Sequence, residues 1–154
     1  GAKSNFEHAR RLNPSAKEPE MNLGLISMLN HNYTKAQEQI GAAAGVPEAA
    51  DALGVYYLTQ GDLAKAVRTF GDSKTNNAAL AQILSQDYSA AKSTLASIKN
   101  PDATTYYLTA ILGARTNNEN MVMSNLRQAV KLDKSLLSRA KNDLEFAKYN
   151  LSYL

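Results

Sequence analysis

The residues that could carry out chemistry in this sequence are scattered. His8 and His31 have no second histidine or carboxylate three or four residues away, the spacing at which a helix presents two metal ligands on one face. The stretch GAAAG, residues 41–45, lacks the Lys-Ser/Thr pair and the preceding strand of a phosphate-binding loop. No glycine-flanked serine indicates a nucleophile, and we expect Asp51 and Asp143 to be solvated or to lie at the rim of a surface. The sequence therefore predicts no enzyme, no metal and no other cofactor.

The composition excludes several classes of binding partner. Seventeen Lys and Arg residues against 14 Asp and Glu give a net charge of +3, with no basic cluster of the kind that nucleic acid requires. Without cysteine there is no disulfide or thiolate metal site, and no apolar run approaches the length of a membrane span, about 18 residues. We therefore expect neither nucleic-acid binding nor direct membrane insertion. The 14 Asn and 8 Tyr residues favour the bacterial cell envelope, with the cytoplasm as the alternative.

One pattern recurs along the chain. It begins with Asn or Asp, continues with a small or apolar residue four positions on, and ends with a larger apolar residue after four more. Its copies are residues 32–40, 62–70, 87–95 and 118–126. The middle position holds Ala36, Ala66, Ala91 and Val122, and the last holds Ile40, Phe70, Leu95 and Leu126. Asn and Asp are preferred N-caps, and residues four apart share a helix face, so each copy predicts an amphipathic helix.

A second helical pattern precedes each copy. Apolar residues recur at intervals of three and four over residues 20–29, 48–60, 77–86 and 103–115. Short turns lie between each run and the helix after it, around His31, at Gly61, at Gln86 and at residues 116–118. Such short turns predict antiparallel helix hairpins and an all-α protein.

The hairpins define an organisation for the whole chain, which we expect to be a single domain over residues 1–154. The hairpins are expected at residues 17–46, 47–71, 72–100 and 101–133. Residues 3–14 match the second helix of a truncated repeat, which suggests a piece of a larger bacterial protein. Residues 134–151 are expected to form one capping helix. Its buried face would carry Leu137, Ala140, Leu144, Ala147 and Leu151.

The stretch LGVYYLTQGDLAKAVRTF, residues 53–70, resembles the tetratricopeptide repeat (TPR). The matching positions are Leu53, Gly54, Tyr57, Gly61, Ala66 and Phe70, and the other copies are more degenerate. The resemblance implies a right-handed superhelix, or α-solenoid. It also predicts that Gly54 lies where its two helices cross closely, with Ala66 as the small partner. Gly24, Ala79 and Ala110 occupy the column of Gly54 in the other hairpins.

The resemblance also implies a function. In this family the first helices of the hairpins line a concave groove that binds peptides. By alignment the groove residues are Met21, Leu25, Met28, Asp51, Val55, Leu58, Asn76, Leu80, Ile83, Tyr107, Ile111 and Arg115. Because this lining is mostly apolar, we expect an apolar protein segment, such as an amphipathic helix, and not a clamped C-terminal carboxylate. The predicted function is a non-catalytic scaffold for protein interactions, with the partner's identity and the oligomeric state left open.

Two alternatives remain. The first is a structural spacer within a larger envelope protein, whose groove is filled by its own helices, and the second, more remote, is an enzyme or enzyme accessory domain. An exposed apolar patch of more than a few hundred Å² would favour partner binding. A groove occupied by residues 134–154 would favour the spacer. Any single groove residue is as readily explained by core packing as by binding.

Overall fold

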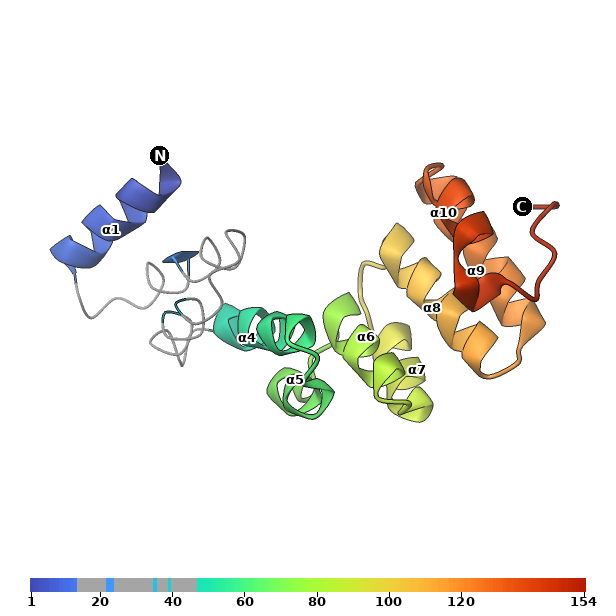
Figure 1. The fold of residues 1–154 in the computed structure, drawn as a ribbon, viewed down its shortest axis with the longest axis horizontal. Coiled ribbons are helices and arrows are strands. Elements are labelled where there is room, and N and C mark those ends of the chain that lie inside the picture. Colours follow the sequence, from blue (N-terminus) through green and yellow to red (C-terminus); the bar gives the residue numbers. More distant parts are fainter. Residues whose placement is uncertain (14–21, 24–34, 36–38, 40–46) are drawn as a thin grey trace. The chain divides into compact units, whose positions relative to one another are not determined.

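The computed structural model describes residues 1–13, 22–23, 35, 39 and 47–154. Every regular element within these ranges is a helix, which confirms the all-α prediction (Figure 1). Contacts divide the chain into two compact units, residues 1–71 and 72–154, and each is described by itself. The first predicted hairpin, residues 17–46, lies almost wholly outside the described residues.

In the first unit, helix α4 (Pro47–Thr59) packs against helix α5 (Leu63–Phe70), and helix α1 (Ala2–Leu12) has no buried residue. Gly54 of α4 lies at a close approach, as the sequence predicts. A Cβ at this position would lie 2.5 Å from Cε1 of Phe70. The three nearest atoms belong to the ring of Phe70, which the sequence did not indicate, and Ala66, the predicted partner, is fully buried.

The second unit is organised around one helix. Its elements are α6 (Asn76–Leu84), α7 (Tyr88–Ala96), α8 (Ala103–Arg115), α9 (Glu119–Leu132), α10 (Leu136–Asn142) and the 3-10 turn η1 (Leu144–Phe146). Helix α8 packs against α6, α7, α9 and η1, whereas α10 packs on α9. Any surface built from α6 and α8 therefore also depends on the C-terminal residues.

The same turn joins α4 to α5, α6 to α7 and α8 to α9. The second residue after each first helix has a left-handed backbone: Gly61 (φ 75°), Gln86 (φ 63°) and Asn117 (φ 56°). The next amide donates to the carbonyl five residues back, as in a Schellman motif. The next residue, Asp62, Asp87 or Asn118, then caps the second helix by accepting a hydrogen bond from the backbone amide three residues on. The N-caps predicted in these three copies are confirmed.

The repeated positions form the core. The middle position of the pattern is fully buried at Ala66, Ala91 and Val122, and the last position is buried at Phe70, Leu95 and Leu126. Ala79 and Ala110, in the column of Gly54, are also fully buried. The repeated pattern therefore marks buried positions in each of the helix pairs that the structure describes.

The single helix predicted over residues 134–151 is wrong. Helix α10 ends at Asn142, Asp143 has an extended backbone, and η1 follows it. The Asp143 side chain accepts the backbone amide of Glu145, a local bond that competes with continuation of a helix. As a result Leu144 is 90% exposed and Ala147 is exposed, whereas Phe146 is 1% exposed. Of the predicted face, Ala140 and Leu151 are buried.

Candidate functional site

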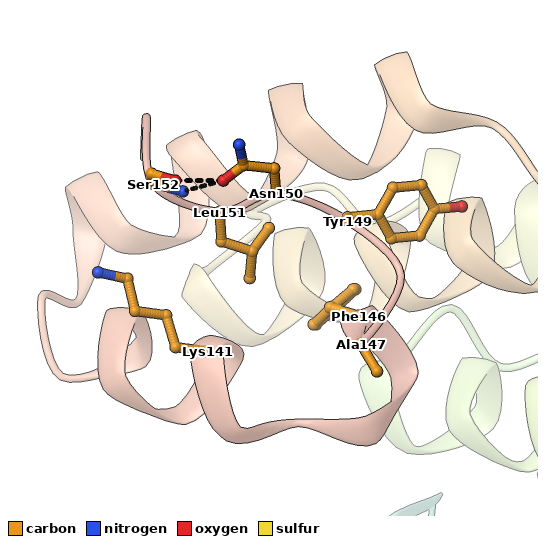
Figure 2. Close-up of a pocket in the computed structure, with 7 residues that line it drawn as sticks. All are labelled: Lys141, Phe146, Ala147, Tyr149, Asn150, Leu151 and Ser152. Atoms are coloured by element: carbon orange, nitrogen blue, oxygen red, sulfur yellow. Dashed lines mark hydrogen bonds between the residues drawn. The ribbon is translucent and has the colours of Figure 1, made fainter.

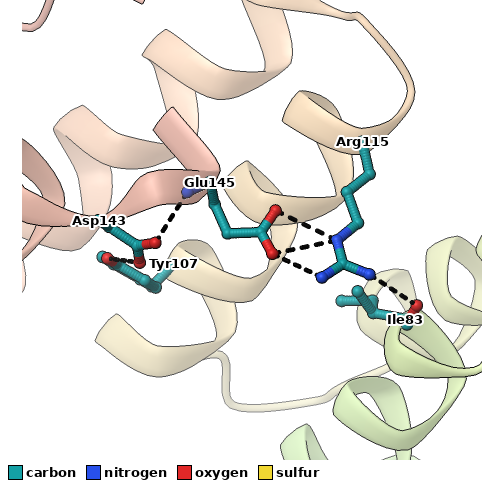
Figure 3. Close-up of polar contacts among 5 residues, drawn as sticks. All are labelled: Ile83, Tyr107, Arg115, Asp143 and Glu145. Atoms are coloured by element: carbon teal, nitrogen blue, oxygen red, sulfur yellow. Dashed lines mark hydrogen bonds and ion pairs between the residues drawn. The ribbon is translucent and has the colours of Figure 1, made fainter. Parts of the chain in front are cut away.

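The predicted groove residues of α8 lie on one side of that helix. Tyr107, Ile111 and Arg115 are four residues apart, so their side chains line up along a stripe. The C-terminal residues of the chain cover this stripe. Figure 3 shows Asp143 and Glu145, which follow α10, reaching Tyr107 and Arg115 on α8.

At one end of the stripe, Arg115 binds Glu145 through two nitrogen atoms. Nη2 lies 2.5 Å from Oε1 of Glu145, and Nε lies 3.1 Å from Oε2 (Figure 3). Each of the two side chains is 27% exposed, so the pair is partly shielded from water. Nη1 of Arg115 also donates to the carbonyl oxygen of Ile83 on α6, at 3.4 Å. The hydrogen bond to Glu145 raises the pKa of Arg115 further above its usual range, so Arg115 is a permanent cation.

At the other end, Tyr107 donates its hydroxyl proton to Oδ2 of Asp143 over 2.6 Å. Its ring meets that of Phe146 edge to face, with the centroids 5.5 Å apart, and the guanidinium of Arg139 lies 5.2 Å from its centroid. Burial raises the pKa of Tyr107 well above its usual value, and the hydrogen bond to Asp143 adds to this effect. The hydroxyl therefore stays protonated and acts as a donor.

Two of the groove residues predicted on α6, Asn76 and Ile83, have structural roles instead. Ile83 is 1% exposed and belongs to the core. Asn76 joins α6 to the start of α8: its amide donates to Asp102 and its side-chain oxygen accepts from the hydroxyl of Thr105. Asp102 caps α8 by accepting the amide of Thr105, and this bond lowers the pKa of Asp102. Asn76 thus has a structural hydrogen-bonding role in this structure.

Part of the predicted groove remains open as a small cavity. Leu80 of α6 and Tyr107 and Ile111 of α8 line a cavity of about 200 Å³. Its other walls are Thr104, Leu108, Leu136, Arg139 and Asp143. The structure therefore brings three predicted groove residues together, but α10 and the residue after it close the cavity on one side.

The remaining predicted residues are more dispersed. Asp51, Val55 and Leu58 are half-buried on α4 in the first unit, and Oδ1 of Asp51 is buried with no hydrogen-bond partner among the described residues. Asp51 is thus only partly exposed to solvent. Met21, Leu25 and Met28 lie outside the described residues.

Sequence reasoning missed Asp143, Glu145 and Phe146. Asp143 is expected to be a solvated or rim residue, and the sequence did not indicate that both of its oxygens accept hydrogen bonds. One signal was available: Asp is a strong N-cap, and Asp143 stands inside the region predicted as one helix, where it favours a break.

Two further hollows lie in the second unit. One, of about 330 Å³, is formed by Lys141 and residues 146–152 except Lys148, and Figure 2 shows Asn150 bonding Ser152 beside it. The other, of about 300 Å³, is mostly apolar and lies among α7, α8 and α9, next to Leu95, Tyr106 and Met121. Neither contains a set of side chains arranged for catalysis.

The described part of the chain contains no candidate for a metal site or a membrane span. Those residues include no group of three or more His, Cys, Asp or Glu side chains that could hold a metal ion. None of the helices they form is both long enough and apolar enough to cross a membrane.

No protein-family model matches the chain, and no curated protein is similar to it in sequence. The resemblance to TPR proteins therefore rests on residues 53–70 and their weaker copies.

Proposed function

We propose that this chain is a non-catalytic, TPR-like helical segment with a structural role. In this proposal, antiparallel hairpins stack into a right-handed superhelix, and the groove of the last hairpin is filled by the chain itself. The observation that carries the proposal is the cover over Tyr107, Ile111 and Arg115. These are groove residues by alignment, and residues from α10 to Leu151 pack on or beside them.

The physical reason is the apolar face of the α8–α9 hairpin. No second hairpin covers this face among the described residues that follow α9, so the face needs a cap with a polar outer side. Leu136, Ala140, Phe146 and Leu151 supply the apolar side, because they form one core cluster with Tyr107 and with residues of α9. Arg139, Lys141 and Lys148 are exposed and supply the polar side.

Deletion of residues 143–154 tests the structural role. We expect the deletion to lower the melting temperature strongly and to increase hydrogen exchange in α8 and α9, because Phe146 and Leu151 would no longer cover their helices. Deletion of residues 1–12 is the matched control, since α1 has no buried residue. Unchanged exchange in α8 and α9 after the C-terminal deletion would contradict the proposal.

The second candidate is the scaffold that binds a protein segment. The cavity lined by Leu80, Tyr107 and Ile111 favours it, because Leu80 and Ile111 are only half-buried and offer apolar surface. Affinity capture with the wild-type chain and with Leu58→Asp and Leu80→Asp variants tests it. A partner that binds the wild type and is lost with either variant supports the scaffold. The same set of proteins with all three chains argues against it.

A further inference from the structure

We propose that the face of α8 bearing Tyr107 and Arg115 is a binding site for a short acidic segment that ends in an aromatic residue, and that the chain's own residues 143–146 occupy it. The proposal rests on the second candidate function, the binding of a protein segment, and names the chemistry of that segment. The occupant in this structure has the order Asp-Leu-Glu-Phe.

The receptor side consists of groups held by helices. Tyr107 and Arg115 are eight residues apart on α8, which separates their Cα atoms by about 12 Å along the helix axis. Arg115 also donates a hydrogen bond to the carbonyl oxygen of Ile83 on α6, so one of its contacts does not depend on residues 143–146. A phenol donor and a guanidinium at this separation suit two carboxylates on one peptide.

The occupant makes its contacts through side chains. The carboxylates of Asp143 and Glu145 accept hydrogen bonds from Tyr107 and Arg115, and Phe146 packs its ring on Tyr107. Leu144, between the two acids, is 90% exposed. Because these contacts are made by side chains, we expect a separate peptide with the same side chains to make them as well.

The covalent link explains how the site would be controlled. A tethered segment has an effective concentration on the order of millimolar or higher, so it excludes weaker competitors. Phe146 and Leu151 add buried apolar contacts that a competitor must replace. Weakening residues 145 and 146 should therefore open the site to a peptide in solution.

The first experiment measures the binding of a fluorescent peptide, NDLEFAKYNLS, by anisotropy. The protein is the full chain with Glu145→Ala and Phe146→Ala. We expect saturable binding at least tenfold tighter than to the wild-type chain. Adding Arg115→Ala should weaken this binding at least tenfold, as should Glu→Gln in the peptide. No saturable binding, or binding that Arg115→Ala leaves unchanged, would overturn the proposal.

The second experiment covers the case in which that double variant does not fold. The chain has no cysteine, and Leu144 is exposed, so Leu144→Cys offers one labelling position for a nitroxide in a chain with all the proposed contacts intact. Peptide in excess of the effective concentration of the tethered segment, on the order of millimolar, should raise the mobile fraction of the label's spectrum, and the Gln-containing peptide should not. An unchanged spectrum at saturating peptide would overturn the proposal. The deletion test of the structural role does not depend on either result.

Discussion

The ring of Phe70 lies against the backbone of Gly54, at a distance that leaves no room for a side chain. A Cβ at position 54 would be 2.5 Å from Cε1 and 2.6 Å from Cζ of that ring. We expect Gly54→Leu to lower the free energy of unfolding by about 1–3 kcal/mol, because α5 or the ring would have to move. Urea unfolding followed by circular dichroism measures this. Ala64→Leu, on an exposed position of α5, is the control and should have little effect.

The pair of Arg115 and Glu145 should contribute measurable stability. Its two-nitrogen geometry and partial shielding place it above an ordinary surface pair, so we expect a coupling energy of about 1 kcal/mol in a double-mutant cycle of Arg115→Ala and Glu145→Ala. The coupling should shrink in high salt. Lys65→Ala is the comparison: Lys65 lies 3.7 Å from Asp62 in a more exposed pair, and its loss should change stability little. A coupling near zero would mean that the Arg115 contacts are incidental.

Gln86 holds a left-handed backbone without being glycine. Because that conformation strains residues with a Cβ, we expect Gln86→Gly to raise the free energy of unfolding by about 0.5–1 kcal/mol. Gln60→Gly is the matched control. Gln60 donates a helical hydrogen bond at the end of α4, and its replacement should destabilise. If both variants destabilise equally, the strain at Gln86 is negligible.

The raised pKa of Tyr107 predicts that the protein loses stability at alkaline pH. Its pKa is higher in the folded than in the unfolded chain, so above a pH of about 10 the unfolded chain loses the phenol proton while the folded chain keeps it. The contribution of Tyr107 is therefore complete below that pH and declines as the pH rises further. We expect Tyr107→Phe to reduce the steepness of this decline in unfolding measurements between pH 8 and 11. Tyr153→Phe, at an 80% exposed position, should leave the slope as in the wild type.

The local features of this fold could be predicted from the sequence. Asp62, Asp87 and Asn118 were recognised as N-caps, and the burial of Ala91 and Leu126 followed from spacing within one helix. Capping bonds and residues four apart involve neighbours along the chain, so they depend little on the rest of the fold.

The candidate site could be predicted only in part. Tyr107, Ile111 and Arg115 were identified through alignment with the TPR pattern, but their contacts were not. The alignment also assigns Asn76 and Ile83 to the groove. In the structure, the Asn76 side chain hydrogen-bonds to Thr105, and Ile83 is buried in the core.

What the sequence by itself determined is a set of helices, their caps and the small residues where pairs of helices meet. The tertiary structure alone decided what covers α8. The hydrogen bond from Tyr107 to Asp143 spans 36 positions in the sequence, and the contact of Arg115 with Glu145 spans 30. Such contacts form only because helix α10 ends before Asp143 and residues 144–151 pack on α8 and α9. No periodic pattern encodes that change of direction, since it results from the burial of Phe146 and Leu151 against distant helices.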